Sequence, residues 1–209
     1  GSKAEDGDTF FGNTVAGTVV TSFSSARVNV VGETTIDAAT LGATAEVDTD
    51  IDASVEDGAV KVLTVWAAAD PRVTIGDNTG TTTIKLSDKL TAEAKSSLTI
   101  NATAKPGNAN DASLDAAVVN VNVVDVAIPG IVPAGFSSGA DLAVGGNALV
   151  TATNAVSFKA TDTVLVTATA DGEVANAVGA TLALTVVEVD TTAAITGNAA
   201  ITAPTVDVL

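Results

Sequence analysis

The segment Gly146-Asn147-Ala148-Leu149-Val150-Thr151-Ala152 is one copy of a motif that occurs four times in this chain of 209 residues. All four copies share a glycine and, four positions later, a β-branched apolar residue. The glycines are separated by 48, 66 and 51 residues. Such a repeat predicts a domain built by stacking copies of one structural unit. The other copies are Gly32-Glu33-Thr34-Thr35-Ile36-Asp37-Ala38, Gly80-Thr81-Thr82-Thr83-Ile84-Lys85-Leu86 and Gly197-Asn198-Ala199-Ala200-Ile201-Thr202-Ala203.

Two further landmarks follow the glycine. Residues 98–104 (LTINATA) match residues 164–170 (VLVTATA), and each stretch begins 18 residues after its glycine. Residues 121–126 (VNVVDV) match residues 184–189 (LTVVEV), and more loosely residues 63–67 (LTVWA). In the two closer copies an apolar pair precedes an acid. The alternation of inward-facing and outward-facing residues is therefore expected to shift by one position there, as at a β-bulge or a corner.

The distance from this third landmark to the next glycine varies. It is 15 residues from Val65, 23 from Val123 and 11 from Val186, so insertions are expected at one structural place. The longest insertion contains residues 129–136 (PGIVPAGF). Its prolines argue against a central strand and predict a surface loop.

The secondary-structure signal is β throughout most of the chain. Val, Thr and Ile dominate, apolar and polar residues alternate, and clusters of Gly, Asn, Asp and Pro separate the runs, which predicts an all-β fold. Residues 87–95 are ambiguous, because Ser87 could also cap a short helix there. The expected strands are Arg27–Val31, Thr44–Val55, Val60–Trp66, Thr82–Leu86, Leu98–Ala104, Ala116–Ile128, Leu149–Thr153, Val164–Ala170, Ala180–Val189 and Ala199–Thr202.

The favoured architecture is a right-handed parallel β-solenoid over residues 21–209, preceded by an N-terminal extension over residues 1–20. The repeat is too long for one coil but fits two or three coils of about 20 residues each. Roughly ten coils, stacked about 4.8 Å apart, would make a rod on the order of 50 Å long.

Two other architectures fit the same pattern. One is a pair of tandem immunoglobulin-like β-sandwiches that divide near residues 105–110, a polar stretch with Pro and Gly. The other is a single jelly-roll-like filament subunit that donates an N-terminal strand, with Phe10, Phe11 and Val15, to its neighbour.

Residues 178–189 (VGATLALTVVEV) and 194–203 (AITGNAAITA) resemble the β-helical repeat regions of very large bacterial surface adhesins, the filamentous-haemagglutinin-like and leukotoxin-like proteins. The resemblance is clear over about residues 112–209, weaker over residues 26–104 and absent from the first 20. It implies a secreted, non-enzymatic stalk or adhesion segment of a longer cell-surface protein. The partner would be a protein or glycan surface ligand, or copies of the chain itself in a filament.

The composition excludes several function classes. The chain has no His and no Cys, which removes the usual ligands of zinc, haem and iron–sulfur sites and the base of most nucleophilic catalysts. Its formal charge of −16 argues against nucleic acid as a partner. The most apolar run, residues 116–128, is interrupted by Asn120, Asn122 and Asp125 and is too short for a membrane-spanning helix.

We therefore expect no enzyme and no cofactor, and calcium is the single candidate ion. The remaining enzymatic alternative is a carbohydrate-active β-helix enzyme, because paired carboxylates alone can cleave glycosides. The single tryptophan, Trp66, lies inside an apolar strand and is expected to fill the core.

One acidic stretch contains candidate ligands for a cation, Glu46-Val47-Asp48-Thr49-Asp50-Ile51-Asp52. Alternate residues of a strand share a face, so Glu46, Asp48, Asp50 and Asp52 would form one row while the residues between them point inward. Calcium would relieve the repulsion within this row through oxygen ligands. Consecutive carboxylates would lie about 7 Å apart, so an ion would also need a ligand from a neighbouring segment. The alternative role is protection of an exposed sheet edge.

Overall fold

The computed structural model describes residues 9–10, 13–55, 60–105, 117–124, 138–171 and 180–209. These residues form fifteen strands joined by turns, and no helix occurs among them. The strands belong to three sheets in which every pair is parallel except β1 with β2. The predicted all-β fold is therefore confirmed, and its strands are parallel.

The first sheet has the order β1-β2-β5-β8-β12, and the long strand β5 also pairs with β9, which pairs with β13. The second sheet has the order β14-β10-β6-β3, and the third has the order β15-β11-β7-β4. The strands of the first sheet are β1 (Thr9–Phe10), β2 (Asn13–Val30), β5 (Val60–Ile75), β8 (Ala117–Val124), β9 (Asp141–Val144), β12 (Ala180–Val187) and β13 (Thr192–Ile195). Those of the second are β3 (Thr34–Ala38), β6 (Thr81–Leu86), β10 (Asn147–Ala152) and β14 (Ala200–Thr202). Those of the third are β4 (Leu41–Val55), β7 (Lys89–Ala104), β11 (Ala155–Ala170) and β15 (Thr205–Val208).

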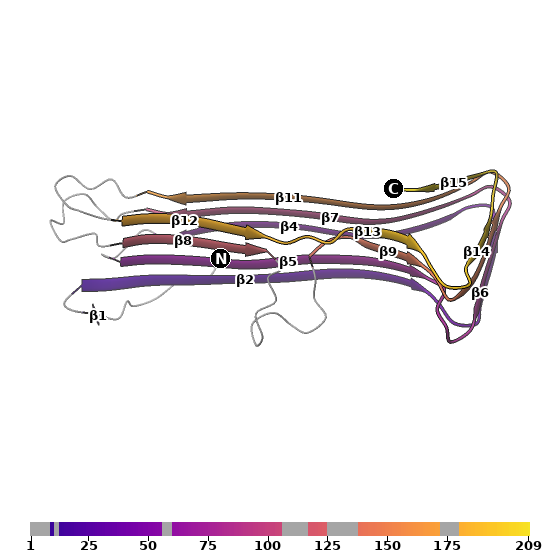
Figure 1. The fold of residues 1–209 in the computed structure, drawn as a ribbon, viewed down its shortest axis with the longest axis horizontal. Helices are drawn as coiled ribbons and strands as arrows, with labels where there is room; N and C mark the ends of the chain where they lie inside the picture. Colours follow the sequence, from indigo (N-terminus) through magenta and orange to yellow (C-terminus); the bar gives the residue numbers. More distant parts are fainter. Residues whose placement is uncertain (1–8, 11–12, 56–59, 106–116, 125–137, 172–179) are drawn as a thin grey trace.

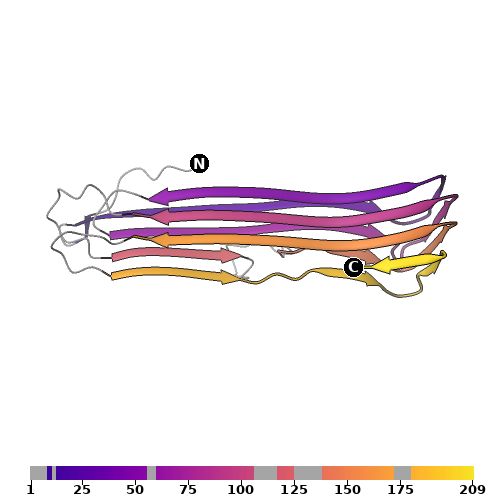
Figure 2. The ribbon, with the colours of Figure 1, turned by 90° about the horizontal axis from the view of Figure 1, so that it is seen from above.

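The chain runs through the three sheets in turn and does so four times. We call each circuit a pass: β2 to β4, β5 to β7, β8 to β11 and β12 to β15. Each strand pairs with its equivalents in the neighbouring passes. Figure 2 shows the passes stacked in sequence order, from indigo to yellow. The strands of the first and third sheets run along the long axis of the molecule (Figure 1).

The pairing register confirms the repeat found in the sequence. The four β-branched residues of the glycine motif, Ile36, Ile84, Val150 and Ile201, occupy one register position of the second sheet. The second landmark also holds, since residues 98–104 pair with residues 164–170 in the predicted register.

The third landmark is right in its two closer copies and wrong in the looser one. Leu184 pairs with Val121 as predicted, but Val65 pairs with Asn122 and not with Val123. Val65 is fully buried, and so is Asn122. The sheet therefore aligns inward-facing positions, whereas the sequence match aligned similar residue types and slipped by one, which reverses the face of every side chain.

The length of a structural unit differs from the prediction. Thr34 pairs with Thr82, 48 residues later, so one glycine spacing is one complete pass and not two or three coils. The reason is the length of the strands, since β5, β7 and β11 each contain 16 residues. The stack thus has four layers where about ten were expected, and the longest dimension follows the strands.

The alternative architectures differ from the structure in strand direction. Immunoglobulin-like sandwiches and jelly rolls are built from antiparallel sheets, whereas the sheets here are parallel. Strands β7 and β11 pair over 16 residues, so one sheet contains strands from both sides of the proposed division near residues 105–110. The helix considered for residues 87–95 is wrong, because β7 begins at Lys89.

At the N-terminal end, paired structure begins before the predicted boundary. Residue 20 lies within β2, which pairs with β5 from Val15 onward. Of the two phenylalanines assigned to a donated strand, Phe10 belongs to β1, and Phe11 lies outside the described residues.

The longest insertion falls after the third landmark, as predicted, but the passes also differ in length at a second place. Ile75 and Thr81 are six positions apart, whereas their register equivalents Val144 and Asn147 are three apart. Strand β5 is continuous, and its residues Ala67 and Arg72 pair with Val124 and Asp141. Between these two pairs the chain contains residues 68–71 in the second pass and the longer stretch 125–140 in the third. In the fourth pass the corresponding break is residues 188–191, between β12 and β13. The strands β8 and β12 thus end at the Val-Val pair where a corner was predicted, and the proline-containing segment 129–136 lies outside the described residues.

Two clusters of apolar side chains fill the space between the sheets. One lies beside the short second sheet and includes Ile84, Val150 and Phe158, and the other includes Leu63 and Leu98 from the long strands. Trp66 belongs to neither. Its neighbours Val65 and Ala67 face the core, so Trp66 is on the outer face, where it is half-buried. The expectation that it fills the core is wrong.

Candidate functional site

The acidic row lies on β4, the edge strand of the third sheet. Burial alternates along the strand, so that Val47, Thr49 and Ile51 are buried. The predicted face of the row is therefore confirmed. Its members, all exposed, are Glu46, Asp48, Asp50 and Asp52.

The two ends of the row have partners on the neighbouring strand β7. Lys95 Nζ lies 2.6 Å from Glu46 Oε1, and this hydrogen bond raises the pKa of Lys95. At the other end, Asn101 Nδ2 donates to Asp52 Oδ1 at 3.0 Å. These cross-strand contacts tie the first pass to the second on the outer surface.

The middle of the row is different, because Asp48 and Asp50 stand opposite the hydroxyl residues Ser97 and Thr99. Among the described residues no group of three His, Cys, Asp or Glu side chains has the arrangement of a metal site. Calcium binding by this row therefore stays a prediction.

A second charged cluster, which the sequence reasoning missed, lies on the outer face of the first sheet. Asp70 is fully buried and accepts hydrogen bonds from Arg72 Nε at 2.6 Å and from Arg27 Nη2 at 3.0 Å. Arg72 Nε also lies 3.7 Å from Asp141 Oδ2. The cluster joins three passes, because Arg27, Arg72 and Asp141 share one register position.

The charges in this cluster are unequally compensated. The hydrogen bond to Asp70 raises the pKa of Arg72 above its usual value. Burial raises the pKa of Asp141, the charges of Asp190 and Asp70 raise it further, and Arg72 opposes them. Toward the fourth pass the cluster therefore carries two carboxylates, Asp141 and Asp190, beside a guanidinium already engaged by Asp70.

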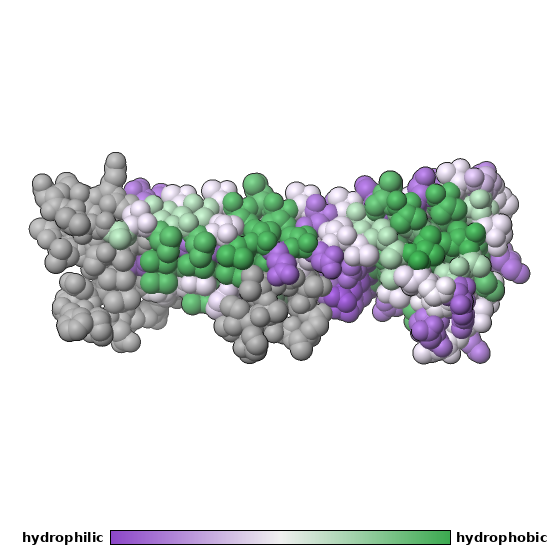
Figure 3. Space-filling view, in the orientation of Figure 1, coloured by the Kyte–Doolittle hydropathy of each residue, from purple (hydrophilic) through white to green (hydrophobic). Residues whose placement is uncertain are grey.

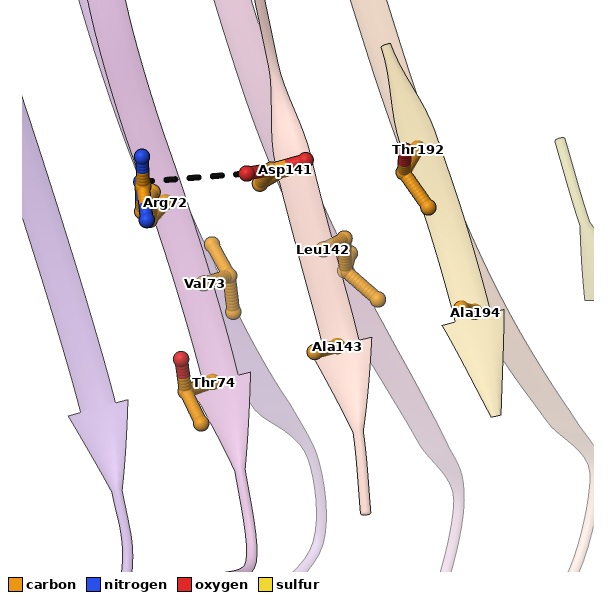
Figure 4. A pocket seen from close by; sticks show the side chains of 8 residues that line it. All are labelled: Arg72, Val73, Thr74, Asp141, Leu142, Ala143, Thr192 and Ala194. Atoms are coloured by element: carbon orange, nitrogen blue, oxygen red, sulfur yellow. Dashed lines mark ion pairs between the residues drawn. The ribbon is translucent and has the colours of Figure 1, made fainter. Parts of the chain in front are cut away.

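A shallow hollow of about 230 Å³ lies next to this cluster. Figure 4 shows that its lining comes from the three neighbouring strands β5, β9 and β13, with the Arg72–Asp141 pair among the residues drawn. Its volume is below the range typical of small-molecule sites. The residues that line it are Arg72, Val73, Thr74, Asp141, Leu142, Ala143, Thr192 and Ala194.

The fourth pass has an exposed apolar surface. Green, apolar side chains gather over β12 and again over β13 in the space-filling view (Figure 3). Solvent exposure of so many large apolar residues in one part of a chain is typical of an interaction surface. The large exposed apolar residues of this pass are Leu182, Leu184, Val186, Val187, Val189, Ile195, Val206, Val208 and Leu209.

Comparison of the chain with protein-family models, with curated proteins and with solved structures found no match. The part of the chain that the structure describes contains no helix of the length and apolarity needed to cross a membrane.

Proposed function

We propose that this chain is a non-enzymatic extracellular structural or adhesion module, a rigid stalk segment of a bacterial surface adhesin. In this proposal the four passes are turns of a right-handed parallel β-solenoid. Right-handedness is the expectation for a crossover that returns to a parallel strand of the same sheet. A protein or glycan on another surface would be its ligand.

The observation that carries the proposal is the pairing of long parallel strands in one register. Strands β4, β7 and β11 pair over 15 and 16 residues, with buried apolar residues repeated from pass to pass. Hydrogen bonds along such strands, together with a continuous core, make a stack that resists bending.

Contacts between outward-facing side chains of neighbouring passes support the role of a rigid stalk. Lys159 Nζ lies 3.3 Å from Glu93 Oε1, and Asn154 Nδ2 donates to Asp88 Oδ1 at 2.6 Å. Both contacts join the second pass to the third, as Lys95 and Glu46 join the first to the second. The acidic surface as a whole would keep an apolar-rich chain soluble outside the cell.

Small-angle X-ray scattering of dilute protein, with and without millimolar calcium, tests the stalk proposal. We expect a calcium-independent, elongated monomer whose radius of gyration exceeds the roughly 17 Å of a compact chain of this length. Two compact lobes that stiffen with calcium would contradict it. Adhesion is then tested by binding of the immobilised chain to glycans and extracellular matrix proteins, with heat-denatured chain as the control.

A second candidate function is a filament subunit that donates its N-terminal strand to a neighbour. The exposed apolar surface of the fourth pass favours it. Since β2 begins at Asn13, removal of residues 1–12 tests it while leaving β2 whole. Strand donation requires polymers of the full chain that disappear in this truncated form.

A further inference from the structure

The two outermost passes leave strand edges that have no neighbour within the described residues. On one side of the stack these are the edges of β2, beyond its short pairing with β1, and of β3 and β4. On the other they are the edges of β12, β13, β14 and β15, and of β11 where it extends beyond its pairing with β15. Figure 2 shows the first and fourth passes at opposite faces of the stack. Backbone groups along a free edge tend to pair with another strand.

We propose that a second copy of this chain binds head to tail, its first pass adding in parallel to the fourth pass of the preceding copy. The same register that joins passes within one chain would continue across the junction. The proposal goes beyond the stalk function, and it differs from strand donation because whole passes add edge to edge.

The apolar residues of the two edges match when the register is extended by one pass. Ile201 would lie beside Ile36 of the next copy, which extends the row that already contains Ile84 and Val150. Val206 would lie beside Leu41 of the next copy, since both align with Leu90 through Val156. The exposed apolar residues of the fourth pass that align with buried positions, Val187, Ile195, Val206 and Val208, would thereby be covered.

The charges of the two edges are also complementary. Arg27 lies on the first pass with 47% of its side chain exposed. At the same register position in the fourth pass is Thr192. Asp190 precedes Thr192 by two residues, as Asp70 precedes Arg72. Arg27 of the next copy would therefore stand near Asp190, on the side of β2 opposite to its own Asp70, at the point where carboxylates are in excess.

These features select a second copy as the occupant. The first pass has strands in the same three sheets and in the same direction as the fourth, so each sheet can continue into the next copy. In the third sheet this continuation covers the four residues of β15. The two surfaces are different parts of the chain, which makes the contact heterologous, and repeated translation gives an open stack and not a closed dimer.

Sedimentation velocity of the full chain, from micromolar to submillimolar concentration, tests the proposal, with electron microscopy of the largest species. We expect concentration-dependent growth of linear particles. Asp190→Arg and Arg27→Glu should each weaken association by about tenfold or more. An equimolar mixture of the two variants should restore it, since each junction then joins opposite charges. A parent chain that stays monomeric, or variants that associate as the parent does, would overturn the proposal.

One more variant separates this result from misfolding. The N–H of Thr192 donates to the carbonyl oxygen of Ala140 within the chain. The N–H of Ala193 therefore faces the free edge, because the N–H groups of successive strand residues point to opposite sides of the strand. Ala193→Pro should block association while the thermal midpoint and the dilute scattering curve stay those of the parent. Unchanged association of this folded variant would refute edge pairing. If association is lost while the scattering curve of dilute protein is unchanged, the stalk proposal is not affected.

Discussion

Arg27 and Arg72, the two arginines of the chain, occupy the same register position on β2 and β5 and both donate hydrogen bonds to Asp70. The carboxylate is fully buried, whereas both guanidinium groups reach solvent. A buried carboxylate needs such partners because its hydration is lost. The pair therefore holds the first two passes together from the outer face of the first sheet.

Asp70→Ala is expected to lower the free energy of unfolding by about 1.5 to 3 kcal/mol, since it removes hydrogen bonds to a charged group while the guanidinium groups left behind reach solvent. Arg27→Ala should cost less, because Arg72 remains bound to Asp70. Urea unfolding followed by circular dichroism measures both. The matched control is Asp37→Ala on the outer face of β3, where the side chain is exposed and the effect should stay within about 0.5 kcal/mol. Equal losses in Asp70→Ala and the control would show that the cluster is not structural.

The stability contributed by Asp141 is expected to depend on pH. Burial raises the pKa of its carboxyl in the folded chain, so the folded chain binds this proton more readily than the unfolded chain. The Asp141 contribution to the free energy of unfolding therefore rises as pH falls from neutrality through the folded pKa. Asp77 acts in the opposite sense, because hydrogen bonds from Thr79 lower its pKa.

Asp141→Asn separates the effect of Asp141 on stability from that of Asp77. We expect this variant to be more stable than the parent at pH 7, by at most about 1 kcal/mol because the side chain is partly exposed and screened. The difference should shrink as pH falls through the raised pKa, while the Asp77 contribution cancels. Urea unfolding of dilute protein from about pH 3 to about pH 8, a range that includes the usual carboxyl pKa values, gives the free energy of unfolding of both proteins. A difference that is constant over this range would be evidence against the assignment.

Gly146 is the motif glycine whose replacement should cost most. Its φ is +59°, which side chains disfavour, and an added Cβ would overlap the carbonyl of Asp77 in the preceding pass. We expect Gly146→Ala to lower the free energy of unfolding by about 3 kcal/mol or more. Gly42→Ala, where nothing lies within 4 Å of the added carbon, is the control and should be close to neutral. Similar thermal midpoints for the two variants would show that the turn tolerates a side chain.

Asn122 and Asn120 are expected to respond in opposite ways to the same substitution. Both are fully buried. Asn120 Nδ2 donates to the carbonyl oxygens of Ala102 and Thr169 at 2.7 and 3.0 Å, whereas the amide of Asn122 has no hydrogen-bond partner among the described residues. Asn122→Val should raise the free energy of unfolding by about 1 to 2 kcal/mol, and Asn120→Val should lower it. Destabilisation by both substitutions would indicate a partner for Asn122.

The acidic row is expected to protect the edge of β4. Replacement of Asp48 and Asp50 by valine removes charge from an exposed edge strand and should increase aggregation, measured by light scattering during incubation. The matched control is Asp48→Asn with Asp50→Asn, which removes charge without adding apolar surface. A calcium site would instead produce a calcium-dependent rise in the thermal midpoint that these asparagine variants lose and that magnesium does not reproduce.

The sequence by itself determined the strand character, the glycine repeat and the face of the acidic row. The alternation around Asp48 and Asp50 puts acids on one side of β4 whatever lies beside it, because side-chain direction along a strand is a local property. The glycine motif likewise aligned Ile36, Ile84, Val150 and Ile201, since all four are β-branched apolar residues four positions after a glycine.

Only the tertiary structure decided which segment lies beside which. The slip at Val65, the outward position of Trp66, the assembly of Arg27 and Arg72 around Asp70, and the use of a whole 48-residue spacing for one pass all depend on pairing between residues far apart in the chain. Pairing register is selected by burial of the inner face across every strand at once. A sequence match between two short segments carries no such information, because it does not include the other strands. The core is enclosed by all three sheets together.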